Sequence, residues 1–186
     1  MTKSIVISGP PAVGKTTVAK GLAKEFNFQY LSGGDVLKEM AKEQGFNSDG
    51  DDWWDTPEGM TFLNQREQNS EFDKNLDKKL TELFNQGGMV ITSYTLPWLI
   101  ENGVKIWLEG SHESSTKRMQ SRDNMSSENA YEITKARFDK NKALYKKLYG
   151  FSFGEDKDVF DVIINTDNLT ANQVIDVTTE TVRKLL

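Results

Sequence analysis

The stretch Gly9-Pro10-Pro11-Ala12-Val13-Gly14-Lys15-Thr16 matches the pattern G-x-x-x-x-G-K-[ST] of a phosphate-binding loop. Before it comes Ile5-Val6-Ile7, a β-branched run typical of a buried strand, and after it apolar residues recur at helical spacing. A loop of this kind binds phosphate when it joins a strand to a helix, and both flanking patterns are present. An incidental Gly-Lys turn would need neither pattern, so the stretch predicts a nucleoside triphosphate ligand.

Each part of this loop has an expected task. The glycines let the backbone turn so that N–H groups face phosphate oxygens, and a helix beginning near Lys15 adds the positive end of its dipole. Lys15 is expected to reach the β- and γ-phosphates, Thr16 to bind Mg²⁺ through its hydroxyl, and Thr17 to hold the α-phosphate. The predicted nucleotide-binding residues of the loop are Gly9, Pro10, Pro11, Ala12, Val13, Gly14, Lys15, Thr16 and Thr17.

Outward from the loop, strand and helix patterns alternate. Short apolar runs typical of buried strands occupy 28–31, 89–93, 104–108 and 159–165. An apolar stripe at helical spacing begins at Ser70 and ends before Gly87-Gly88, and further helices are predicted at about 113–122, 128–148 and from 171 to the C-terminus. This alternation predicts an α/β fold with a parallel sheet covered on both faces, whose ligands bind at the carboxyl ends of the strands.

Composition excludes several classes of protein. The chain has 186 residues, with 23 Lys and Arg against 28 Asp and Glu, a formal net charge of −5. One domain is expected at this length, and the acidic balance disfavours a nucleic-acid partner. The absence of cysteine and the single His112 exclude a disulfide framework, a thiol nucleophile and a His-rich metal centre. No signal peptide or membrane-spanning run is found, so we expect a cytoplasmic protein without a membrane partner.

The loop alone does not choose between GTP switches, motors and small-molecule kinases, which all share it. The chain is short for a motor with its attachments, and it contains no Asn-Lys-x-Asp motif for reading guanine. These observations favour a small kinase.

Several segments resemble the nucleoside monophosphate kinase family, and most closely the archaeal-type cytidylate kinases. The matching segments are Ile7 to Thr17, Leu31 to Glu43, Lys105 to Leu108, Tyr145 to Gly150 and Asp161 to Asp167, with 44–69 the weakest part. The resemblance implies a doubly wound, five-stranded P-loop sheet in a single domain, residues 1–186. Its expected parts are a core at 1–34, 87–112 and 150–186, an acceptor-binding region at about 35–86, and a short lid at about 118–137.

Three arginines fall in the expected lid. Arg118 and Arg122 are four residues apart on one predicted helix, and Arg137 is on the next. The resemblance implies that Arg122 and Arg137 are catalytic and pair with the transferred phosphoryl group, that Arg118 stacks on adenine, and that the backbone of Asn165-Thr166 reads adenine. Alternatively, all three are solvated helix arginines. A further lid arginine of the family is replaced by Leu144.

The acceptor side departs from the family pattern. Lys38 stands where relatives carry an arginine for the acceptor phosphate, and the third strand ends in Thr92-Ser93-Tyr94 instead of an acidic residue, glycine and arginine. Lysine still binds phosphate, as a point charge instead of a fork. Asp35 is the best remaining carboxylate for orienting an acceptor hydroxyl or a magnesium-bound water, with the cap of a helix as its alternative role.

An acidic, aromatic segment at 49–60 carries Trp53 and Trp54. The pair could cap an acceptor pocket, while Arg66 on the following helix could replace a lost phosphate-binding arginine. The alternative is that the tryptophans pack a surface loop onto the core.

Three functions follow, in order of preference. The first is transfer of the γ-phosphoryl of ATP to CMP or dCMP with Mg²⁺, giving CDP or dCDP. The second keeps ATP but moves the phosphoryl to a hydroxyl of a phosphorylated metabolite such as mevalonate 3-phosphate, with Asp35 and Tyr94 in the acceptor site. The third is a nucleotide-binding regulator without turnover. The sequence is compatible with a monomer or a homodimer.

Overall fold

A parallel five-stranded sheet forms the centre of the computed structural model, which describes residues 3–48, 53, 56–68 and 70–186; for 63, 66–68 and 70 only the backbone is described. Its strands are β1 Ile5–Ser8, β2 Gln29–Ser32, β3 Met89–Thr92, β4 Val104–Glu109 and β5 Val162–Asn165. Their order is β2-β3-β1-β4-β5, and all neighbouring pairs are parallel. The predicted α/β fold with a five-stranded parallel sheet is therefore confirmed.

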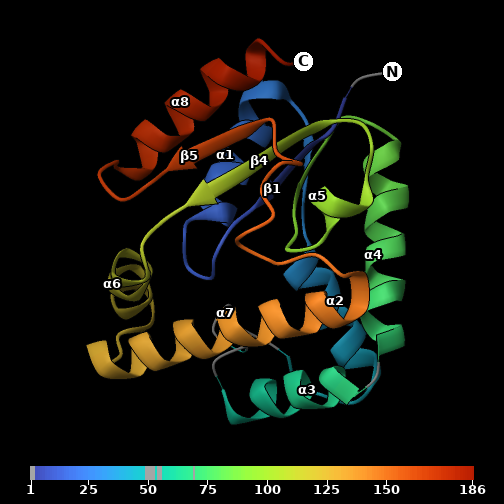
Figure 1. Ribbon diagram of the computed structural model, residues 1–186, viewed down its shortest axis with the longest axis vertical. Coiled ribbons are helices and arrows are strands. Elements are labelled where there is room, and N and C mark those ends of the chain that lie inside the picture. Colours follow the sequence, from blue (N-terminus) through green and yellow to red (C-terminus); the bar gives the residue numbers. More distant parts are fainter. Residues whose placement is uncertain (1–2, 49–52, 54–55, 69) are drawn as a thin grey trace.

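Helices connect successive strands and cover both faces of the sheet (Figure 1). They are α1 Lys15–Phe26, α2 Gly33–Glu43, α3 Pro57–Gln68, α4 Ser70–Asn85, α5 Leu96–Leu99, α6 His112–Asp123, α7 Ser127–Tyr149 and α8 Ala171–Arg183. Side chains alternate along β1: Ile5 and Ile7 pack in a cluster with α1 and α8, and Val6 packs in a second cluster with α2, α4 and α5. This alternation makes the sheet the middle layer of three.

The carboxyl ends of the strands meet at the edge over which α7 runs, with α6 at one end of α7 and α3 below it (Figure 1). At this edge β1 leads into the phosphate loop, β2 into α2, and β3 into residues 93–95. Loops that follow neighbouring parallel strands come together, which is where ligands bind in folds of this class.

Two details differ from the sequence-based expectations. The last strand begins at Val162, because Asp158 to Asp161 form turns and a bend before it. The short helix α5 was not predicted, since four residues give no periodic pattern, and it forms after Ser93 Oγ accepts hydrogen bonds from Thr95 N and Leu96 N. Within the described ranges, no helix has both the length and the apolar character needed to cross a membrane.

Candidate active site

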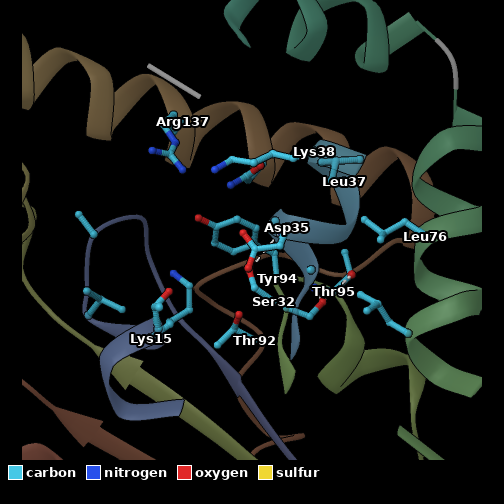
Figure 2. Close-up of a pocket in the computed structure, with 18 of the residues that line it drawn as sticks. Lys15, Ser32, Asp35, Leu37, Lys38, Leu76, Thr92, Tyr94, Thr95 and Arg137 are labelled. Atoms are coloured by element: carbon cyan, nitrogen blue, oxygen red, sulfur yellow. Dashed lines mark hydrogen bonds between the residues drawn. The ribbon is translucent and has the colours of Figure 1, made fainter. Parts of the chain in front are cut away.

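A cavity of about 590 Å³ opens at the carboxyl edge of the sheet (Figure 2). Its walls come from the phosphate loop, the start of α2, one face of α4, residues 92–95 at the end of β3, and parts of α6 and α7. The cavity is large enough for a small ligand and joins elements that are far apart in the sequence.

The phosphate loop has the backbone that its sequence predicts. Gly9 has φ 147°, and a Cβ there would lie 2.3 Å from the Leu108 carbonyl oxygen, so only glycine fits between the loop and β4. Gly14 has φ 104° and caps α1, whose first turn faces the cavity. Lys15 Nζ donates hydrogen bonds to the carbonyl oxygens of Gly9 at 2.9 Å and Pro10 at 2.6 Å. These two hydrogen bonds fix the Lys15 side chain against the backbone of its own loop.

Tyr94 lies against Lys15 in the middle of the cavity, with the Lys15 Nζ 4.6 Å from the ring centroid. Burial lowers the pKa of the Lys15 ammonium, and the charge of Arg137 lowers it further against the opposing effect of Tyr94. Burial alone would raise the pKa of the Tyr94 phenol, but the charges of Lys15 and Arg137 outweigh it and hold that pKa below its usual value. The centre of the cavity therefore favours an anion.

The start of α2 supplies Asp35 and Lys38. Ser32 caps this helix, because its Oγ accepts a hydrogen bond from Asp35 N at 3.4 Å. The alternative role of Asp35 as the cap is therefore wrong, and its exposed side chain lines the cavity instead. Lys38 follows one turn later, half-buried, and lines the same cavity (Figure 2).

Two buried carboxylates, Asp73 and Asp77 of α4, line the cavity. The two oxygens of Asp77 accept hydrogen bonds from Thr95 Oγ1 and Tyr149 Oη, each at 2.5 Å. Burial, the bond to Asp77 and its negative charge raise the pKa of Tyr149. Asp77 thereby ties α4 to the turn after β3 and to the end of α7.

These carboxylates were missed from the sequence, although a signal exists. Asp73 and Asp77 are four residues apart and fall among Leu76 and Leu80 on the buried side of α4. Acidic residues are rarely buried without partners, so acidic residues repeated within an apolar stripe indicate a polar site next to the core.

The lid arginines approach from the other side. Arg118 Nη2 donates to the Thr166 carbonyl oxygen at 2.8 Å and to Thr166 Oγ1 at 3.2 Å, which fixes Arg118 to the end of β5. Its Nη1 is buried and has no hydrogen-bond partner among the described residues. Arg122 is exposed and pairs with Asp123, and Arg137 projects from α7 towards Lys15 and Tyr94 (Figure 2). All three arginines line the cavity.

The cavity thus collects most of the residues predicted from the sequence. Those that line it are Ala12, Val13, Gly14, Lys15, Thr16, Thr17, Asp35, Lys38, Tyr94, Arg118, Arg122 and Arg137. Those that do not line it are Gly9, Pro10, Pro11, Asn165 and Thr166. Pro10 and Pro11 border a second hollow of about 200 Å³ behind the loop. Thr166 is buried and Asn165 Oδ1 accepts from Asp167 N, so the reading of adenine by these two residues stays a prediction.

Trp53 takes the second of its two expected roles. Its side chain is 2% exposed and packs with Phe46 and Phe62, at ring-centroid distances of 6.4 and 5.5 Å, in the cluster beneath α2 and α4. It supports the acceptor region from inside and does not line the cavity. Trp54 and the side chain of Arg66 lie outside the described part of the chain.

Comparison with known proteins identifies the family: residues 4–168 match the model of the cytidylate kinase-like family. The chain belongs to this family. A cytidylate kinase of Sulfurisphaera tokodaii is 32% identical over 174 residues, which cover 91% of this chain and 89% of the relative. A cytidylate kinase of Methanocaldococcus jannaschii is 28% identical, covering 97% and 98% of the two chains.

Solved structures agree on the fold. Shikimate kinase from Bacteroides thetaiotaomicron superposes with a TM-score of 0.58 at 16% identity, covering 100% of this chain and 98% of the other. An uncharacterized protein from Eubacterium ventriosum gives a TM-score of 0.64 at 19% identity, covering 98% and 99%. At these identities the likeness supports the P-loop kinase fold alone.

Membership of the cytidylate kinase-like family makes the chain a kinase of nucleoside monophosphate kinase type, with ATP as the implied co-substrate. The cavity agrees with this assignment, because it places a phosphate loop, three arginines and the carboxylates of Asp35, Asp73 and Asp77 in one space. A nucleotide-binding regulator without turnover is disfavoured accordingly.

Proposed function

We propose that this protein transfers the γ-phosphoryl group of ATP to CMP and dCMP, giving CDP or dCDP and ADP. The observation that carries the proposal is the cavity that the phosphate loop and the acceptor end share, with Lys15 and Asp35 facing the same space. The parts proposed for this task are the core at 1–34, 87–112 and 150–186, the acceptor region at about 35–86 and the lid at about 118–137.

The reaction needs charge neutralisation more than covalent chemistry. An oxygen of the acceptor phosphate attacks the γ-phosphorus, the bond to the β–γ bridging oxygen breaks, and ADP keeps that oxygen. Lys15, Arg122 and Arg137 stabilise the negative charge on the transferred group, and nothing on the enzyme is phosphorylated. Arg118 presents its partly buried guanidinium to the nucleotide base. Closure of the α6–α7 lid excludes water.

A magnesium ion fits this site through Thr16, whose exposed hydroxyl lies beside Lys15. In the described ranges no three His, Asp or Glu side chains form a cluster that could hold a metal alone. Mg²⁺ commonly keeps several waters and binds through substrate phosphates, so a single protein hydroxyl suits it. When bound, the ion neutralises charge on the β- and γ-phosphates.

The acceptor end supplies both signs of charge. Lys38 is the proposed cation for the acceptor phosphate, and Asp35 orients the acceptor near the γ-phosphate. Asp73 and Asp77 supply hydrogen-bond acceptors further in, which suit the amino group of cytosine better than the carbonyl that replaces it in uracil. Arg66 remains a candidate for the acceptor phosphate, and Trp54 for the cap of the pocket.

One observation favours a second candidate, phosphorylation of a hydroxyl on a phosphorylated metabolite such as mevalonate 3-phosphate. The Asp35 carboxylate is exposed in the cavity and does not cap α2, so it could orient a hydroxyl for attack. Alcohols depend on such a carboxylate more than phosphate dianions do.

A coupled ADP-release assay with ATP and Mg²⁺ separates the two candidates. CMP, dCMP, UMP and AMP are screened beside mevalonate 3-phosphate, with Lys15→Ala as the inactive control. Rapid turnover of CMP and dCMP is the expected result. Turnover of the phosphorylated alcohol with none of the nucleotides would replace the first candidate by the second.

A further inference from the structure

Hydrogen bonds to β1 and an aromatic contact fix the position of Tyr94 in the cavity. Ser93 N, just before it, donates to the Ile7 carbonyl oxygen at 3.1 Å, and the Tyr94 carbonyl oxygen accepts from Ser8 Oγ at 3.4 Å. Both bonds tie the residue to β1, the strand that leads into the phosphate loop. The Tyr94 ring meets Phe153 edge-on, at 5.6 Å between centroids and an interplanar angle of 88°. Backbone and ring are therefore fixed relative to Lys15.

The polar end of Tyr94 lies where two cations converge. Lys15 Nζ stands over the ring at 4.6 Å from its centroid, and Arg137 approaches from α7 on the opposite wall (Figure 2). Two like charges in one partly buried space repel each other, and each needs an acceptor. The phenol oxygen provides one, while the ring face provides a cation–π contact for Lys15.

We propose that Tyr94 is a positioning residue for phosphoryl transfer: its ring holds Lys15, and its hydroxyl lies between Lys15 and Arg137 until the phosphoryl group enters. The inference rests on the proposed function, because it assumes that both cations act on the transferred group. On arrival, the phosphoryl oxygens replace the phenol oxygen as the acceptor for the cations, and the phenol O–H can donate to one of them. The free enzyme thereby keeps its cations at the spacing that transfer requires.

Two substitutions separate the hydroxyl from the ring. Tyr94→Phe keeps the ring and removes the oxygen, so kcat is expected to fall about tenfold while the Kd of ATP changes less than about threefold. Tyr94→Leu also removes the ring, so the Kd of ATP is expected to rise about fivefold beyond the Phe variant. Kd is measured by calorimetry without an acceptor and kcat by ADP release, with thermal unfolding of each variant as the test of folding. Thr181→Val on α8, which does not line the cavity, is the matched loss of a hydroxyl and leaves both constants unchanged.

A double-mutant cycle tests whether Tyr94 acts through the cations. If it does, Tyr94→Phe reduces kcat less than about threefold in an Arg137→Ala background, because the hydroxyl no longer bridges two charges. A tenfold loss in both backgrounds, or wild-type kcat in Tyr94→Phe, would overturn the inference. Equal ATP affinity in the Phe and Leu variants would overturn the role of the ring.

Failure of the proposed function gives a different result. A wild-type enzyme that turns over none of the screened acceptors contradicts the proposed function, and the ATP affinities of the Phe and Leu variants still decide whether the Tyr94 ring holds Lys15. A wild type that phosphorylates CMP, with a Tyr94→Phe variant equal to it, contradicts the inference alone.

Discussion

The two ends of the cavity are built in opposite ways. The phosphate end is built around one continuous stretch, residues 12–17, which leads from the turn after β1 into the first turn of α1. The proposed acceptor end gathers Asp35 from α2, Asp73 from α4, Thr95 from the turn after β3 and Leu144 from α7. A binding site made from one segment can be recognised by its local pattern, whereas a site made by packing depends on contacts that only the fold creates. Substitutions at each end test whether this difference holds.

The largest effect is expected for Lys15→Ala at the phosphate end. Lys15 Nζ bonds to carbonyl oxygens of its own loop, so its removal should leave the free energy of unfolding nearly unchanged. We expect kcat/KM for ATP to fall about 10³-fold, as for loss of a charge that acts on the transferred phosphoryl. Steady-state kinetics measure this, with Lys24→Ala, an exposed lysine of the same helix, as the control. An active Lys15→Ala enzyme would remove the loop from the mechanism.

The second-largest effect is expected for Gly9→Ala, which lowers the stability of the fold. Alanine there combines a left-handed backbone with a Cβ 2.3 Å from the Leu108 carbonyl oxygen, so the loop must move away from β4. We expect the free energy of unfolding to fall by about 3 kcal/mol in urea titration. Gly45→Ala is the matched control, because its φ is also positive at 90° but a Cβ there would meet no described atom within 4 Å; about 1 kcal/mol is expected. If the two variants lost equal amounts of unfolding free energy, the close approach of Gly9 to β4 would contribute nothing to stability.

At the acceptor end, Asp73→Asn tests recognition by the buried carboxylates. Replacing one acceptor oxygen with an NH₂ donor should raise the KM of CMP about tenfold and that of ATP less than twofold. The same change should reduce the preference for CMP over UMP, because the carbonyl of uracil can accept from the new donor. Glu71→Gln on the exposed side of α4 is the control. A rise in KM for ATP of equal size would mean that Asp73 supports the whole cavity and not the acceptor.

The sequence predicts local features of this protein well and features that depend on packing poorly. The five strands, the helix beginning at Ser70 and the phosphate loop were predicted correctly, because short apolar runs, period-3.6 patterns and the loop motif are local signals. The role of Asp77 was not predicted, because it comes from hydrogen bonds to Thr95 and Tyr149, which are 18 and 72 residues away. Trp53 shows the same limit: an aromatic residue beside a pocket and one beneath it look alike in a single sequence.

The smallest effect is expected at Asp167, which follows β5 and makes a long-range contact outside the cavity. Both Asp167 carboxylate oxygens accept from Ser111 N, at 2.8 and 3.1 Å, which joins the end of β5 to the start of α6. These bonds hold the pKa of the Asp167 carboxyl below its usual value. A lowered folded-state pKa stabilises the fold above the unfolded pKa, near 3.9, and this contribution is lost as pH falls through the folded value.

Asp167→Asn should therefore lower the free energy of unfolding by less than about 1 kcal/mol at pH 7, because the site is partly solvated. The difference between wild type and variant should shrink as pH falls below about 4, and chemical denaturation at pH 7, 5, 4 and 3 measures it. A difference that stays constant across this range would assign the effect to the shape of the hydrogen bonds and not to the charge. A difference that grows towards low pH would reverse the sign and contradict the lowered pKa.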